Sequence, residues 1–144
     1  MRLPGSNPRP ADARCRMRAE LTVRDKEDLA SRSCVPCRGG VPPLSETDAA
    51  RRLESTPAWR LEEHGKRLAR RFEFEDFVGA MRFVNRVAEV AEQQGHHPDI
   101  AIHWNRVDLL LWTHKIGGLH ENDFILAAKI DRLLEDDPDA SVAG

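Results

Sequence analysis

The longest regular pattern of hydrophobic and polar positions is a helical one over residues 75–94. Apolar residues recur there at intervals of three or four: Phe77, Met81, Val84, Ala88 and Ala91. This period predicts a helix with one buried face. Gly95 follows where a left-handed residue often ends a helix, and Pro98 prevents the helix from resuming.

Shorter runs of the chain show the two-residue period of β-strands. Residues 59–63 and 66–74 flank Gly65 and predict a β-hairpin. Residues 100–104 alternate between apolar and other side chains, which predicts a half-buried strand. Residues 106–113 predict its antiparallel partner, so the chain is expected to contain two hairpins.

Two more helices complete the pattern. Residues 46–54 predict a short helix that begins after Ser45, and Ser45 with Asp48 resembles a capping box. Residues 121–135 predict a last amphipathic helix. The order α-β-β-α-β-β-α favours an α+β fold, in which a four-stranded antiparallel sheet carries helices packed on one face.

The chain divides into three parts by composition. Residues 1–43 hold six of the nine prolines and no sustained hydrophobic period, so we expect an irregular N-terminal arm. Residues 44–135 contain every predicted element and form one domain. Residues 136–144 are expected to be a flexible tail.

Bulk composition narrows the classes of function. A formal net charge of −2 gives no overall field for nucleic acid or an anionic membrane, so we expect neither as a direct partner. No apolar run is long enough to span a bilayer, and the first twenty residues lack the apolar segment of a secretory signal. The presumed core has no cysteine, which favours a reducing, cytoplasmic location.

Cys34 and Cys37 form a CxxC pair that resembles half of a zinc site. No second pair follows, and the next histidine, His64, lies far downstream. A thioredoxin-like motif would need a following βαβ unit, which the pattern does not predict. We therefore expect these residues to be ordinary thiols.

Five of the six histidines lie within 25 residues. His96 and His97 enter the first strand of the second predicted hairpin, and His114 leaves its partner strand. The start of one antiparallel strand meets the end of the other, so these three histidines should converge. His103 should lie at the opposite, turn end. Asp123 should return to the three histidines through the Gly117-Gly118 turn.

Three converging imidazoles suit two kinds of chemistry. They can bind zinc with an open water position, although adjacent residues on an extended backbone point in opposite directions. They can also bind an organic substrate and transfer protons near neutral pH. A carboxylate such as Glu92, one helical turn before His96, would orient one ring and raise its basicity. The spacing alone leaves both interpretations open.

The segment from Trp59 to Asp131 resembles the pterin-4a-carbinolamine dehydratases. The matching pieces are Trp59, FEFEDF (residues 72–77), RFVNRVAEVAEQQ, GHHP (residues 95–98), Trp104-Asn105, Thr113-His114, Gly118-Leu119 and DFILAAKID (residues 123–131). The arm CVPCRGGVPPLS is similar to the N-terminal region of bacterial members. These pieces keep the family's order and spacing over roughly half of the chain.

The resemblance implies a metal-free dehydratase that needs no cofactor, because the pterin is the substrate. It would convert 4a-hydroxytetrahydropterin, left by an aromatic amino acid hydroxylase, to quinonoid dihydropterin and water, so that tetrahydrobiopterin can be recycled. The implied catalytic set is His96, His97 and His114. His96 and His114 would transfer protons, and His97 would mainly hold the pterin.

The resemblance also implies supporting residues and partners. Glu92 would support the histidine pair, Asp123 would lie at the site rim, and Trp59 and Trp104 would help to form its walls. A homodimer or homotetramer is expected. Animal members also stabilise dimers of a homeodomain transcription factor, so a non-catalytic module that binds or dimerises a partner protein is the alternative.

Two departures from the family pattern lie near this site. His120 stands where a Ser or Thr usually caps the last helix, so we expect a weaker cap, by roughly 1 kcal/mol. Trp112 replaces a small residue before Thr113-His114, which should reshape the pocket wall. Neither change removes a catalytic group.

Overall fold

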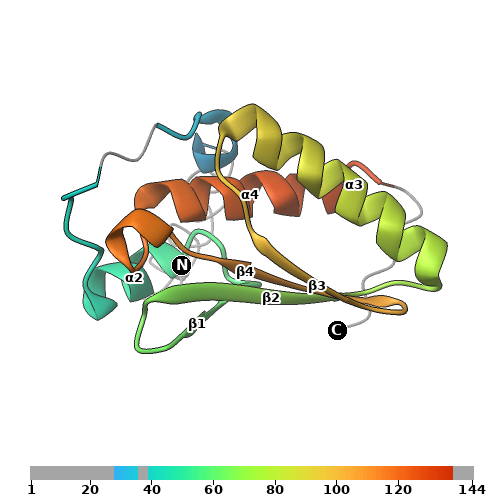
Figure 1. Cartoon of the computed structure of the whole chain (residues 1–144), viewed down its shortest axis with the longest axis horizontal. Coiled ribbons are helices and arrows are strands. Elements are labelled where there is room, and N and C mark those ends of the chain that lie inside the picture. The colour runs from blue at the N-terminus through green and yellow to red at the C-terminus, as the bar shows by residue number, and fades with distance from the viewer. Residues whose placement is uncertain (1–27, 36–38, 138–144) are drawn as a thin grey trace, which may run out of the picture.

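The computed structural model describes residues 28–35 and 39–137 of the 144-residue chain. Its elements follow the predicted order (Figure 1). They are α2 (Glu46–Leu53), β1 (Arg60–Glu62), β2 (Arg67–Glu73), α3 (Phe77–Gln94), β3 (Asp99–His103), β4 (Arg106–Leu111), a 3₁₀ turn η1 (His114–Ile116) and α4 (Glu121–Glu135). The predicted α+β class is therefore confirmed.

The four strands form one antiparallel sheet in the order β1-β2-β4-β3. Helices α3 and α4 lie side by side over one face of this sheet, as predicted (Figure 1). Strands β1 and β3 form the two edges. The last pairs of β3 with β4 join Ile102 to Val107 and His103 to Arg106, so the tight turn lies at Trp104 and Asn105.

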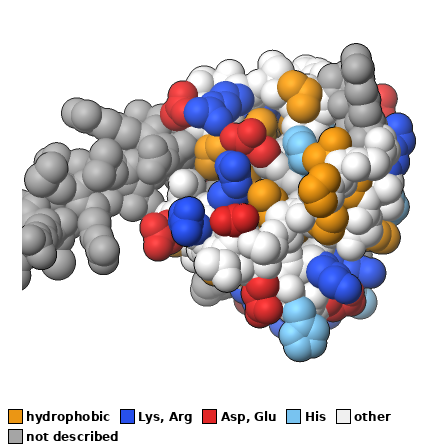
Figure 2. Space-filling view, turned by 90° about the vertical axis from the view of Figure 1, so that its left-hand side faces the viewer, with side chains coloured by type: hydrophobic (Ala, Val, Ile, Leu, Met, Phe, Trp, Pro, Cys, Tyr) orange, Lys and Arg blue, Asp and Glu red, His pale blue; other side chains and the backbone are white. Residues whose placement is uncertain are grey.

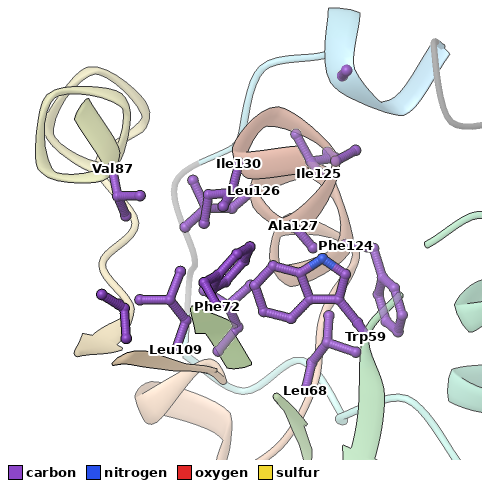
Figure 3. Close-up of a cluster of buried hydrophobic side chains, with 14 of the residues drawn as sticks. Trp59, Leu68, Phe72, Val87, Leu109, Phe124, Ile125, Leu126, Ala127 and Ile130 are labelled. Atoms are coloured by element: carbon purple, nitrogen blue, oxygen red, sulfur yellow. The ribbon is translucent and has the colours of Figure 1, made fainter. Parts of the chain in front are cut away.

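The core fills the space between the sheet and the two long helices. Figure 3 shows side chains of β2, β4 and the segment before β1 meeting those of α3 and α4. Phe72 and Phe83 join the sheet to α3, with ring centroids 4.8 Å apart. Aromatic pairs at such separations contribute about 0.5–1.5 kcal/mol beyond their area burial.

The buried face of α3 differs from the predicted one. Its buried residues are Ala80, Phe83, Val84, Val87 and Ala91. Phe77 is 49% exposed, and Ala88 is exposed as well, so the predicted stripe through them is wrong. An apolar-rich helix offers overlapping stripes, and the packing of the sheet and α4 selects one of them.

Strand β3 was predicted to be half-buried, but all five of its residues are exposed. The reason is its place at the sheet edge, where only β4 pairs with it. Strand β4, between β2 and β3, shows the expected alternation, with Val107, Leu109 and Leu111 buried.

The N-termini of α2 and α4 are both capped. Ser45 Oγ accepts a hydrogen bond from Asp48 N at 3.1 Å, which confirms the predicted cap of α2. His120 Nδ1 accepts from Asn122 N at 3.2 Å, while the Asp123 carboxylate accepts from His120 N at 3.0 Å. The expectation of a weak cap at His120 is therefore wrong, because an imidazole nitrogen accepts where a hydroxyl usually does.

Residues 28–31 are helical and dock on the domain. Leu29 and Ala30 are buried in the core, and Lys129 Nζ donates to the Ala30 carbonyl at 2.8 Å. Asn122 donates to the Val35 carbonyl and accepts from its N–H. The segment before α2, expected to be irregular, thus contains a docked portion. Residues 1–27, Cys37 and the expected flexible tail beyond residue 137 lie outside the described residues.

Charges of both signs are interspersed on the end of the molecule that carries α2 (Figure 2). Arg32 and Arg52 both reach Glu121, at 2.8 and 3.3 Å. This face therefore shows no extended patch of one sign. Among the described helices, none combines the length and apolar character needed to cross a bilayer.

Candidate active site

The structure brings His96, His97 and His114 to one pocket of about 450 Å³. The loop between α3 and β3 supplies one side, and the segment that follows β4 supplies the other. The pocket is lined by Gly95, His96, His97, Pro98, Asp99, Trp112, Thr113, His114 and Lys115. Antiparallel pairing explains this convergence, because Asp99 lies opposite Leu110 in the register.

The backbone that carries His96 is fixed by the end of α3. Gly95 has φ 63° and ψ 26°, the left-handed conformation that closes a helix. His96 N then donates to the Ala91 carbonyl at 3.2 Å. The GHHP segment therefore begins from a hydrogen-bonded helix terminus, and Pro98 directs the chain into β3.

His96 is paired with a carboxylate buried behind it. His96 Nε2 lies 2.6 Å from Asp123 Oδ1, and the side chains are 12% and 0% exposed. The other oxygen, Oδ2, accepts from Thr113 Oγ1 at 2.8 Å and from His120 N at 3.0 Å. The resemblance placed Asp123 at the site rim. In the structure it is instead fully buried beneath the pocket, where it anchors His96.

His97 has a carboxylate partner of a different kind. Its Nε2 lies 2.7 Å from Glu92 Oε1, and the two side chains are 58% and 78% exposed. Glu92 thus supports His97, whereas His96 takes Asp123. An exposed pair of this kind contributes little to stability, typically about 0–1 kcal/mol.

His114 is held by an aromatic neighbour. Its ring stacks on Trp112 with centroids 3.8 Å apart and an interplanar angle of 20°. Thr113, between them in the sequence, points to the interior, where its hydroxyl reaches Asp123. Successive side chains on an extended backbone point to opposite sides. Trp112 and His114 therefore face the pocket, while Thr113 between them faces the buried carboxylate of Asp123.

Two residues that the resemblance placed in the site walls lie elsewhere in the structure. Trp59 is 3% exposed, and its Nε1 donates to Asp131 Oδ1 at 2.8 Å inside the core. Trp104 is 66% exposed at the β3–β4 turn, with φ 52°. Neither residue lines the pocket of this chain. His103 also lies at the turn end, as the strand geometry predicted.

Other pocket residues were missed as members of the site. Asp99 and Lys115 line the pocket, and Asp99 Oδ2 accepts from Trp112 Nε1 at 2.9 Å. Thr113 also lines the pocket and was not singled out as a site residue. Asp99 could have been found from its place directly after the HHP motif, and Thr113 from its place between Trp112 and His114. Trp112 lines the pocket wall, as its departure from the family pattern had suggested.

Comparison with known proteins decides the family. A family model described as pterin 4 alpha carbinolamine dehydratase matches residues 42–133. The chain belongs to this family. The match contains all three pocket histidines, Asp123 and Glu92, so the family region and the pocket coincide.

Curated family relatives are similar over nearly their whole length. A protein of Aromatoleum aromaticum is 50% identical over 107 residues, which cover 74% of this chain and 96% of the relative. A protein of Halorhodospira halophila is 50% identical over 105 residues, or 73% and 96% of the two chains. Both carry the provisional name pterin-4-alpha-carbinolamine dehydratase.

A solved structure supports the same family fold. The crystal structure of a transcriptional coactivator/pterin dehydratase from Brucella melitensis matches with a TM-score of 0.60 and 32% sequence identity. The match covers 63% of this chain and 97% of that one. The shared region is therefore essentially the whole of the smaller protein.

Proposed function

We propose that this protein is a dehydratase that converts 4a-hydroxytetrahydropterin to quinonoid dihydropterin and water. The observation that carries the proposal is the His96–Asp123 pair, which opens onto a pocket shared with His97 and His114. The pocket volume of about 450 Å³ is in the range of small-molecule sites. Family membership supplies the substrate class.

The proposed reaction breaks the C4a–O bond and forms a C4a=N5 double bond. One group protonates the departing hydroxyl so that it leaves as water, and another accepts the proton from N5. Imidazoles suit both tasks, because their ordinary pKa lies near neutral pH. The net reaction consumes no proton and needs no oxidant or reductant.

The structure suggests different tasks for the three histidines. In the tautomer whose Nε2–H donates to Asp123, His96 keeps Nδ1 as an acceptor. We assign His96 to proton transfer from N5 and His114 to protonation of the leaving hydroxyl. His97, exposed and paired with Glu92, holds the pterin.

We propose that this chemistry requires no metal. Among the described residues, no group of three or more His, Cys, Asp or Glu side chains is arranged to hold a metal ion. A zinc hydrolase built on the same histidines is the competing idea. Elemental analysis of the purified protein decides between them, since stoichiometric zinc that is needed for activity would overturn the metal-free proposal.

The direct test is acceleration of 4a-carbinolamine decay by the purified full chain. His96→Gln and His114→Gln should each lower kcat by about 10²–10⁴-fold, the usual contribution of general acid–base catalysis. His64→Gln is the matched control, because His64 is exposed on the β1–β2 turn and does not line the pocket. Undiminished activity in both pocket variants would overturn their assigned roles.

An interaction role is the second candidate, and the exposed edge strand favours it. Ile100 and Ile102 of β3 are 36% and 37% exposed, and Trp104 follows them. Unpaired strand edges with apolar side chains are common association surfaces. We propose self-association as a homodimer or homotetramer through this edge. Sedimentation of wild type and Ile102→Lys tests it: an unchanged oligomer in the variant contradicts this surface.

A further inference from the structure

The pocket histidines differ in what orients their rings. Carboxylates hold His96 and His97, at 2.6 and 2.7 Å. For His114, the structure shows no side-chain hydrogen bond to any described residue, and its ring is exposed. A proton-transfer group needs a fixed orientation, since small misplacements of reacting groups are costly. The ring contact that the structure shows for His114 is its stacking on Trp112.

The indole face of Trp112 lies against the His114 ring. The two ring planes are 20° apart and their centroids 3.8 Å apart, which is close, nearly parallel stacking. Residues two apart on an extended backbone point to the same side, so the sequence Trp112-Thr113-His114 places both rings together. The stack leaves both imidazole nitrogens of His114 at the ring edge, where they can exchange protons.

Charged side chains of two strands, β3 and β2, contact Trp112. Its Nε1 donates to Asp99 Oδ2 at 2.9 Å, which fixes the rotation of the indole in its own plane. The Arg67 guanidinium lies over the ring, 4.5 Å from its centroid. Arg67 is in turn paired with Glu63 at 3.0 Å. With an imidazole and a guanidinium against it, this indole is a support rather than a free platform for substrate stacking.

We propose that Trp112 is the positioning residue of His114, in the role that Asp123 has for His96 and Glu92 has for His97. This proposal rests on the proposed function for its catalytic part. Asp99 and Arg67 set the indole, and the indole sets the imidazole.

The test compares two replacements of similar size, Trp112→Phe and Trp112→Leu. Phenylalanine keeps an aromatic face for stacking, loses the hydrogen bond to Asp99 and offers Arg67 a weaker cation–π partner. Leucine fills space and offers no such face. We expect Trp112→Leu to lower kcat roughly tenfold or more while KM stays within about twofold. Trp112→Phe should retain kcat within about threefold of wild type.

A nuclear magnetic resonance readout separates positioning from activity. In wild type, the ring protons of His114 should be shifted upfield by the indole, with the signal assigned from the His114→Gln spectrum. Trp112→Leu should abolish that shift, and Trp112→Phe should leave a smaller one. The signals of His103, at the opposite, turn end of the β3–β4 hairpin, should stay unchanged as an internal reference.

Each outcome decides the proposal. An unchanged His114 signal or unchanged kcat in Trp112→Leu overturns it, and a rise in KM alone makes Trp112 a substrate wall instead. A wild-type protein without dehydratase activity refutes the proposed function, and the His114 signal then decides the positioning role alone. Should the amide spectrum show that Trp112→Leu is unfolded, an unreduced His114 shift in Trp112→Phe would refute the proposal.

Discussion

One end of the β3–β4 hairpin holds His96, His97 and His114, and the other holds His103 and Trp104 at the turn. Both ends therefore carry imidazoles and lie close to a tryptophan. At the pocket end, α4 places a fully buried carboxylate under the rings. At the turn end, His103 and Trp104 are exposed, and Asn105 ties the hairpin to Phe74 by backbone and side-chain hydrogen bonds.

The comparison shows that histidines alone do not make the site. The pocket end is distinguished by a helix terminus that fixes His96 and by Asp123, whose oxygens meet three separate partners. Partners from α4 and from the segment after β4 arrive only at this end. At the turn end, Asn105 is tied to Phe74, while the side chains of His103 and Trp104 are left in solvent.

The largest effect on this difference should come from Asp123→Asn. The amide cannot accept from all three donors, so His96 loses its orientation and kcat should fall about 100-fold or more. The free energy of unfolding should also fall by about 1–3 kcal/mol, because a buried acceptor is lost. Steady-state kinetics and urea unfolding measure the two effects.

Asp131→Asn is the matched control for Asp123→Asn. Asp131 is also a buried aspartate of α4, at 2% exposure, but it pairs with Arg70 and Trp59 in the core. This variant should be destabilised and keep its kcat. Equal losses of kcat in the two variants would show that Asp123 acts through stability only.

A smaller effect is expected from Glu92→Gln. The glutamine can still hydrogen-bond His97, but it removes the charge from an exposed pair. We expect a rise in KM of about threefold with little change in kcat, because His97 is assigned to substrate binding. Glu89→Gln, an exposed change one turn earlier on α3, is the control. If kcat fell as far in Glu92→Gln as in Asp123→Asn, Glu92 and Asp123 would not differ in their roles.

Cys34 lies behind the pocket end and should show weak reactivity. Burial raises the pKa of its thiol to about 11, against an ordinary 9.0; Lys129 lowers it in part and Asp123 adds to the rise. The thiol should therefore be alkylated much more slowly in the native protein than in urea at pH 8, as measured on the Cys34 peptide by mass spectrometry. Rapid native alkylation would contradict this burial.

The raised pKa of the Cys34 thiol also makes the stability of the fold depend on pH. A raised pKa in the folded state means that the neutral thiol is favoured by folding. Its contribution is fully present below pH 9.0 and is lost as pH rises toward about 11. Comparison of unfolding in wild type and Cys34→Ser across this pH range measures it.

The smallest effect is expected at the turn end. His103→Ala should leave kcat and KM within about twofold of wild type, since His103 lies across from Arg106 and away from the pocket. This variant tests whether the turn end of the hairpin is dispensable for the reaction. A loss comparable to that of His96→Gln would mean that both ends of the hairpin take part in the reaction.

Much of the fold was predictable because its signals are local. The boundaries of α4, the end of α3 at Gly95 and the order of strands follow from periodicity and helix-ending residues. Antiparallel pairing then predicted that His96, His97 and His114 converge and that His103 does not. The hydrophobic period predicted the wrong buried face for α3, because that helix offers several apolar stripes. It also predicted a half-buried β3, whose burial depends on its position in the sheet.

The sequence by itself determined the elements, their order and the identity of the histidine set, because these depend on short-range pattern and on the family's motifs. Only the tertiary structure decided which partner each histidine takes. Asp123 reaches His96 across 27 positions, and Arg67 reaches Trp112 from another strand. The tertiary structure also places Trp59 in the core and Trp104 at the β3–β4 turn, not in the walls of the site. Such pairings depend on how strands and helices cross in space, which no local pattern records.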